Sequence, residues 1–284
     1  MPRWPSSVWT CRSRTRNGNS PSPGFKIVGN TYYVGTYDLG CYLIDTGAGL
    51  ILVNSGAPGS YPLIKANIEA LGFKTSDIKI ITATHGHFDH VGDLAGFQRD
   101  APAAKTYMSE RDAPVLESGG NLDYRRPEGR GIIYDPVKVD VRTKLGDNIK
   151  LGNTDMAVLQ AFGHTPGATS FSFQVTDAGK TYNVLIVNMN GINAGVKLLG
   201  SPGYPTIVED SRIRLPCRRP TPLISGCHRT RDSSTCTLST SLATRITQAA
   251  LAISPLTRPR SPDIRPPTKS NSLRSAHQRT RFFR

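Results

Sequence analysis

Four side chains that can bind a metal lie close together in the stretch THGHFDH, residues 84–90. They are His85, His87, Asp89 and His90. A lone histidine is usually an ordinary polar residue. Burying three histidines and an aspartate together would be costly unless something satisfies them, and the cluster brings no packing gain. Imidazole and carboxylate ligands without thiolate suit Zn²⁺ best, with iron or manganese as alternatives. We therefore predict a metal site here.

A further histidine, His164, lies in AFGHTPGATSFSF, residues 161–173, with glycines at positions 163 and 167. Glycine carries no side chain, so a histidine among glycines at a strand end can approach a metal without obstruction from its neighbours. Beside the first motif, we predict that His164 is the third ligand of the same metal.

Short strands and one helix must position these two motifs. The apolar run IKIITA, residues 78–83, predicts a buried strand directly before the first motif, and MAVLQAF, residues 156–162, predicts one before the second. Residues 61–73 have apolar positions at helical spacing and end near Gly72, so strands on either side make a βαβ step. The class is mixed α and β. The other predicted strands lie near 25–29, 31–37, 41–46, 50–55, 105–108, 137–141, 169–175 and 182–188, with short helices near 93–98 and 109–116.

The net charge of +14 is distributed unevenly along the 284 residues. Residues 25–210 hold 16 basic and 19 acidic side chains, whereas residues 211–284 hold 15 basic and 2 acidic ones. Of those last 74 residues, 29 are Ser, Thr or Pro. We predict a disordered or out-of-frame segment at 1–24, a globular domain at 25–210 and a basic tail at 211–284.

Several classes of protein are excluded by the composition. No apolar run is long enough to span a membrane, and residues 1–24 lack the apolar stretch of a secretory signal. The five cysteines form no CxxC pair, which argues against a zinc ribbon. A basic tail could bind nucleic acid, but its only aromatic residues are Phe282 and Phe283, so it lacks stacking platforms. We expect neither a nucleic-acid nor a membrane partner. The oligomeric state stays open.

The pattern HxHxDH at 85–90, followed about 75 residues later by GHTPG, resembles the metallo-β-lactamase superfamily. The phrases at 29–44, 88–97, 163–173 and 200–210 resemble the third subclass of class B β-lactamases. The resemblance implies a four-layer αββα sandwich with one or two zinc ions at the sheet edge. Residues 182–198 contain no acidic residue where glyoxalase II, lactonases and RNase Z carry a bridging aspartate, which disfavours those groups.

The resemblance also implies a mechanism and roles for individual residues. His85, His87 and His164 would bind the first zinc, and Asp89 and His90 the second. A hydroxide between the metals, oriented by Asp89, would attack the carbonyl of a β-lactam, an antibiotic-resistance activity of the periplasm or of secreted enzymes. Asn190 would donate a hydrogen bond to the substrate carboxylate, and Asn54 stands where the family usually has an aspartate. Hydrolysis of a lactone, thioester or phosphoester, or a nucleic-acid-binding role of the tail, are the alternatives.

One expected ligand is absent from its usual context. The resemblance implies a late histidine in a phrase such as WLxxHAxxF, but the only later histidines, His228 and His277, lack that setting. Codons compatible with PLISGCHRTRDSSTC, residues 222–236, read DIWLSSHAGQFDLH in another frame. We therefore predict that residues from about 211 onward are an out-of-frame translation. The second zinc site would then be weakened, the C-terminal half of the sandwich incomplete and the activity reduced.

Overall fold

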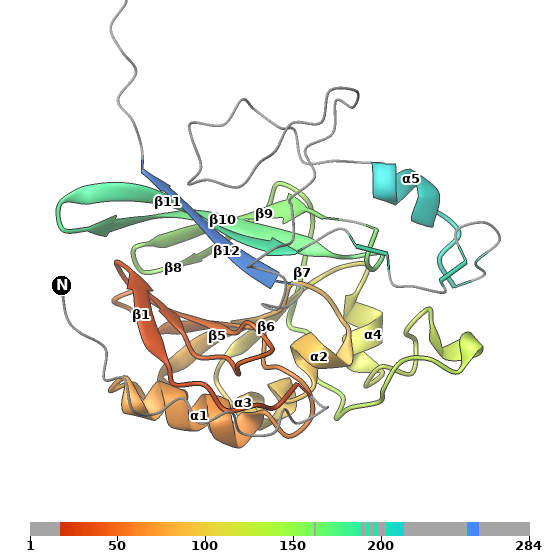
Figure 1. Cartoon of the computed structure of the whole chain (residues 1–284), viewed down its shortest axis with the longest axis horizontal. Helices are drawn as coiled ribbons and strands as arrows, with labels where there is room; N and C mark the ends of the chain where they lie inside the picture. Colours follow the sequence, from red (N-terminus) through yellow and green to blue (C-terminus); the bar gives the residue numbers. More distant parts are fainter. Residues whose placement is uncertain are drawn as a thin grey trace, which may run out of the picture.

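The computed structural model describes residues 18–161, 163–188, 191–192, 196–197, 201, 203–212 and 249–255. These residues form two β-sheets that face each other, with helices on the outer side of one sheet (Figure 1). The mixed α and β class is confirmed. The two facing sheets agree with the predicted sandwich. The prediction that its C-terminal half is incomplete falls mainly on residues 213–248 and 256–284, which lie outside the described part of the chain.

The first sheet has seven strands in sequence order and carries the first histidine motif. Its first four strands are antiparallel neighbours, whereas β4, β5, β6 and β7 run parallel. The strands are β1 (Phe25–Val28), β2 (Thr31–Tyr33), β3 (Tyr42–Asp45), β4 (Leu50–Val53), β5 (Ile78–Thr82), β6 (Lys105–Ser109) and β7 (Val141–Thr143). Because parallel neighbours need a crossover, α1 (Tyr61–Ala70) connects β4 to β5, as the predicted βαβ step requires.

Helices cover the outer face of this sheet (Figure 1). Ile64 and Ile68 of α1 and Phe97 of α3 (Leu94–Asp100) are fully buried in one cluster with strand residues. The shorter elements are α2 (Phe88–Val91), α4 (Ala113–Glu117) and the 3-10 helices η1 (Thr75–Asp77) and η2 (Arg126–Glu128). No helix in the described ranges is long and apolar enough to cross a bilayer.

The second sheet has five strands, all antiparallel, in the order β12-β11-β10-β9-β8. They are β8 (Asn148–Leu151), β9 (Thr154–Gln160), β10 (Thr169–Asp177), β11 (Lys180–Asn188) and β12 (Ala249–Pro255). Their inner side chains, Phe171 and Phe173 among them, pack against Ile51 and Val53 of the first sheet. His164 lies in the loop between β9 and β10, so the second histidine motif belongs to this sheet.

The last described strand, β12, lies in the segment that the composition assigns to a basic tail. The sequence analysis predicted no strand there. Ala249 to Pro255 pairs residue by residue with β11, from Asn188 to Tyr182. The edge of β11 would otherwise present unpaired backbone groups, and the short apolar run at 249–253 supplies a partner strand for it.

Residues 18–24 precede the predicted domain, which begins at residue 25, and the structure describes them. These residues contact the domain through their backbone and through the Asn19 side chain, which donates to the Pro58 carbonyl. The Asn67 side chain of α1 donates to the Ser22 carbonyl at 2.9 Å and accepts the Gly24 N–H at 3.1 Å. The Tyr37 N–H donates to the Ser20 carbonyl at 2.8 Å. Composition alone missed these contacts because the partners lie more than a dozen residues away in the sequence.

The strand predicted at 137–141 begins later than expected. β7 starts at Val141, and the residues before it bond elsewhere. The Val137 N–H donates to the Leu116 carbonyl at the end of α4. Asp140 accepts the Thr106 N–H through its side chain and donates its own N–H to the Thr106 carbonyl. Apolar and polar side chains therefore alternate at 137–141 because this segment packs beside β6, although only Val141 belongs to a strand.

The interface between the two sheets should dominate the stability of the chain. Phe171 is 1% exposed and lies in this interface. We expect Phe171→Ala to lower the free energy of unfolding by about 3–5 kcal/mol, since it removes buried apolar atoms and leaves a cavity. Denaturant titration of the metal-free chain measures this. Leu145→Ala, at a 59% exposed position, should change it by less than about 0.5 kcal/mol. Equal losses of unfolding free energy in the two variants would contradict a dominant role of the interface between the sheets.

Candidate metal centre

The first histidine motif follows β5 directly and begins a helix. Thr84 to His87 form the turn, and His87 is the extended residue that precedes α2. The His90 N–H donates to the His87 carbonyl, which closes the first turn of α2 and places Asp89 and His90 on it. This strand, turn and helix therefore present four candidate ligands at the carboxyl end of β5.

The second motif is a tight loop between β9 and β10. Gly163 has a φ of +120°, a value that disfavours every residue with a side chain. Its N–H donates to the Tyr204 hydroxyl at 3.1 Å, and the same hydroxyl donates to the Thr165 carbonyl. The Tyr124 hydroxyl donates to the His164 carbonyl at 3.2 Å. Two tyrosines thus hold the backbone on both sides of His164.

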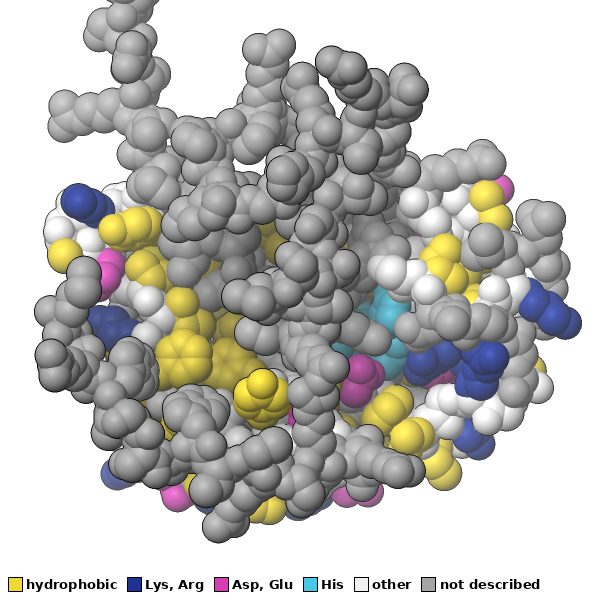
Figure 2. Space-filling view, in the orientation of Figure 1, with side chains coloured by type: hydrophobic (Ala, Val, Ile, Leu, Met, Phe, Trp, Pro, Cys, Tyr) yellow, Lys and Arg dark blue, Asp and Glu magenta, His cyan; other side chains and the backbone are white. Residues whose placement is uncertain are grey.

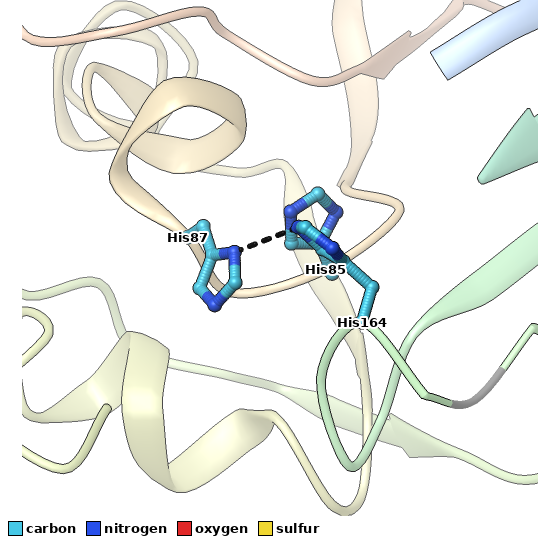
Figure 3. A group of neighbouring side chains, drawn as sticks. All are labelled: His85, His87 and His164. Carbon is cyan, nitrogen blue, oxygen red and sulfur yellow. Dashed lines mark hydrogen bonds between the residues drawn. The ribbon is translucent and has the colours of Figure 1, made fainter. Parts of the chain in front are cut away.

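The structure brings His85, His87 and His164 together, as Figure 3 shows. One ligand atom from each lies within 4.8 Å of the others. His87 Nδ1 is 3.0 Å from His164 Nε2. His164 Nδ1 is 2.5 Å from the Gly191 carbonyl oxygen, which can only accept, so Nδ1 is the donor and the neutral form of the ring has its lone pair on Nε2. That lone pair faces the centre of the group.

A second group shares one member with the first. His85, Asp89 and His90 also offer ligand atoms within 4.8 Å of one another. The His85 and His90 rings lie 4.0 Å apart between centroids, and Asp89 Oδ2 is 3.8 Å from His90 Nε2. The structure therefore gathers five of the residues predicted for the site. It leaves Asn190 untested, because that residue is outside the described ranges.

The chemistry of these donors fits a divalent metal. Burial lowers the pKa of His85 well below its ordinary value, and the charge of His90 adds to this effect. Burial also lowers the pKa of His87, with Arg125 as the next cause. Both imidazoles are therefore neutral near pH 7 and keep a lone pair. Their Nε2 atoms are buried without a hydrogen bond in the described structure, a costly state that a metal or another partner would relieve.

Asn54, the residue directly after β4, forms a hydrogen bond with the first motif. It is fully buried and has a φ of +65°, which asparagine tolerates better than most residues. Its side-chain oxygen accepts the Thr84 N–H at 2.9 Å, and its amide donates to the Gly40 carbonyl. The Thr84 hydroxyl lies 3.2 Å from His90 Nδ1. Asn54 thus bonds to the residue that contacts His90.

Asp112, Asp123 and Arg125 also belong to this region, although the sequence analysis did not select them. Arg125 Nη2 donates to Asp123 Oδ2 at 2.6 Å, and the same carboxylate oxygen lies 3.8 Å from His87 Nε2. Asp112 bonds to both motif loops. No local pattern marks either aspartate, because each lies more than twenty residues from the histidine it approaches.

A cavity lies beside the histidines, and a buried amide lies at the end of β11. A cavity of about 140 Å³ lies beside His87 and is lined in part by Tyr124, Leu122 and Pro166. Figure 2 shows histidine side chains visible on this face, beside acidic and basic ones. Asn188 ends β11, and its buried side-chain amide has no hydrogen bond in the described structure. The two late histidines, His228 and His277, lie outside the described residues.

Known proteins are similar to this chain in sequence and fold. A family model described as the metallo-β-lactamase superfamily matches residues 40–179. The metallo-β-lactamase GOB-18 from Elizabethkingia meningoseptica is 42% identical, with a TM-score of 0.66 over 70% of this chain and 73% of that one. The class B3 di-zinc metallo-β-lactamase LRA-12 from an Alaskan soil metagenome is 40% identical, with a TM-score of 0.66 over 70% of this chain and 75% of that one.

Curated relatives point to a wider range of hydrolases. A hydroxyacylglutathione hydrolase from Bradyrhizobium sp. (strain ORS 278) is 28% identical over 137 residues, which are 48% of this chain and 44% of that protein. The chain spans about half the length of the curated relatives it matches. The fold, the paired histidine motifs and the solved structures agree: this chain belongs to the metallo-β-lactamase superfamily.

Proposed function

We propose that this chain is a zinc-dependent hydrolase that opens the amide bond of β-lactam antibiotics. The observation that carries the proposal is the convergence of His85, His87 and His164 on one point, with Asp89 and His90 beside it. Similarity to class B3 β-lactamases of known structure supports the substrate class. Nitrogen and carboxylate donors without thiolate favour zinc over softer metals.

The chain's own residues account for the remaining requirements of the reaction. A bound divalent metal supplies Lewis acidity, which polarises a carbonyl and activates water near neutral pH. His164 is held by its Nδ1 bond to the Gly191 carbonyl, so its ring cannot turn away from the centre. Asp89, 19% exposed, can accept a hydrogen bond from the attacking water and orient it. No separate nucleophilic side chain is required.

Thioester hydrolysis is the second candidate, because a hydroxyacylglutathione hydrolase is among the relatives. Residues 182–198 argue against thioester hydrolysis, because they contain no acidic residue to match the bridging aspartate of glyoxalase II. β11 ends instead in Asn188, whose amide carries no charge. A neutral residue here would weaken any site that depends on a bridging carboxylate, whereas the β-lactamases of the third subclass do not depend on one.

The substrate class is tested directly with a chromogenic β-lactam. We expect the full chain with Zn²⁺ to hydrolyse nitrocefin, and a chelator to abolish the reaction, because the histidines alone cannot activate water. His85→Ala should lose activity to the same extent. Hydrolysis of S-lactoylglutathione without hydrolysis of nitrocefin would instead favour the thioesterase reading.

Asp89 should matter for the rate far more than for the fold. We expect Asp89→Asn to lower kcat about 10²- to 10⁴-fold, because an amide is a poor acceptor for the proton of the attacking water. Asp155→Asn is the matched control: Asp155 lies exposed on β9, pairs with Lys150 at 3.1 Å and belongs to neither group of candidate metal ligands. Equal rates for the two variants would remove Asp89 from the catalytic machinery.

The two metal sites should differ in affinity. Three imidazoles match the usual protein ligand set of a catalytic zinc, whereas Asp89 and His90 alone leave a neighbouring metal short of ligands. We expect calorimetric titration with Zn²⁺ to resolve one tight site and one weaker site. A chain in which the reading frame after about residue 210 is restored should bind the second ion more tightly. Two equally tight ions in the unrestored chain would contradict this.

A further inference from the structure

A buried carboxylate connects the two loops that carry the histidines. Asp112 is 0% exposed and lies directly before α4. Its Oδ2 accepts the Gly86 N–H at 2.9 Å, and Gly86 stands between His85 and His87. Its Oδ1 accepts the N–H of Gly167 at 2.8 Å, in the loop that carries His164. One side chain therefore bridges the first sheet's ligand loop and the second sheet's ligand loop.

The third bond to Asp112 also comes from the second loop. The Thr165 hydroxyl, one residue after His164, donates to Asp112 Oδ2 at 2.6 Å. All three partners are donors, so the carboxylate serves only as an acceptor. Burial raises the pKa of Asp112, while these three hydrogen bonds oppose that shift. Within the described part of the chain, no lysine or arginine forms an ion pair with Asp112. The carboxylate is thus satisfied entirely by the two ligand loops.

Asp112 gives up a more usual role to make these contacts. It occupies the position that caps α4, where an aspartate ordinarily accepts an N–H from the first turn of its own helix. No such capping bond forms in the structure. An unused cap costs roughly 1 kcal/mol, and the side chain turns instead toward Gly86 and Gly167. A residue that served only α4 would not be arranged in this way.

The surrounding backbone fits closely around the bridge. A Cβ atom at Gly167 would lie 2.6 Å from the Asp112 nitrogen and 2.6 Å from Ser109 Oγ, so only glycine allows this approach. On the other loop, the Tyr134 hydroxyl donates to the Gly86 carbonyl at 2.8 Å. The Gly86 peptide is therefore held on both sides, by Asp112 through its N–H and by Tyr134 through its carbonyl.

We propose that Asp112 is a positioning residue that holds His85 and His87 at a fixed distance from His164 and so assembles the first metal site before the metal arrives. It touches neither metal nor substrate. Its effect passes through the backbone of Gly86 and Gly167. Residues outside the ligand set that orient the ligands commonly change metal affinity about 10- to 100-fold when they are replaced. The proposal rests on the metal centre of the proposed function, and it adds the device that brings the ligands together.

The test measures Zn²⁺ affinity of the metal-free full chain by competition with a chelating dye, well below the melting temperature of every variant. We expect Asp112→Asn to weaken binding at the tight site about 10- to 100-fold, because its amide N–H₂ must face one of the three donors. Thr165→Val, which removes a single donor, should weaken binding less. Asp140→Asn is the control: the Asp140 carboxylate also accepts a backbone N–H, that of Thr106 at 3.0 Å, so the same substitution alters a comparable hydrogen bond away from the histidines.

A purely structural role for Asp112 predicts a different result. The metal-free chain would then melt at a lower temperature, but the folded variant would bind Zn²⁺ with the parent affinity. The absorption spectrum of bound Co²⁺ adds a second readout, since a displaced His164 changes the ligand geometry and hence the visible bands. Parent affinity and a parent spectrum in Asp112→Asn would overturn the proposal.

Two further outcomes are also decisive. If Asp112→Asn does not fold, Thr165→Val decides the question, and parent affinity in that variant overturns the proposal. If the parent chain itself binds no Zn²⁺, the metal centre of the proposed function fails and the role of Asp112 fails with it. Tight binding by the parent with no change in either variant would leave the metal centre intact and remove only the role of Asp112.

Discussion

Three imidazoles from two different sheets share a space in which their ligand atoms lie within 4.8 Å of one another. Nothing about histidine favours this gathering, since buried nitrogen atoms without hydrogen bonds raise the free energy of the folded chain. The surrounding structure must therefore enforce it. His85 and His87 depend on the end of β5, and His164 depends on the turn between β9 and β10. The relative position of the two sheets thus determines whether a metal site exists at all.

The core between the sheets provides the coarse alignment. Ile51 and Val53 on one sheet and Phe171 and Phe173 on the other exclude water from the interface and fix the distance between the layers. Such packing places the ends of β5 and β9 near one another, but a displacement of about 1 Å is enough to spoil a ligand set. The finer alignment comes from polar contacts that cross between loops, those of Asp112 and of the two tyrosines beside His164.

The polar groups around the histidines are connected on several sides. Asn54 bonds to Thr84, whose hydroxyl lies beside His90, while Arg125 fixes the carboxylate of Asp123 near His87. In a buried setting each such bond is stronger than it would be in water, and each missing bond is more costly. Burial also lowers the pKa of His85 and His87, because it disfavours their charged form. These two imidazoles therefore keep a nitrogen lone pair that can bind a cation.

The sequence by itself determined the strands that precede the two motifs, the crossover helix after β4, and the four donors of the first motif. These features are local: alternation marks a strand, helical spacing marks α1, and HxHxDH places four donors on one turn whatever the rest of the chain does. Tertiary structure decided the roles of Asp112, Asp123 and Tyr204, which approach the histidines across gaps of more than twenty residues. It also decided that residues 18–24 pack on α1 and that 249–255 pairs with β11. Hydrogen bonds between segments far apart in the sequence follow from how the two sheets pack, and no periodicity within either segment records that packing.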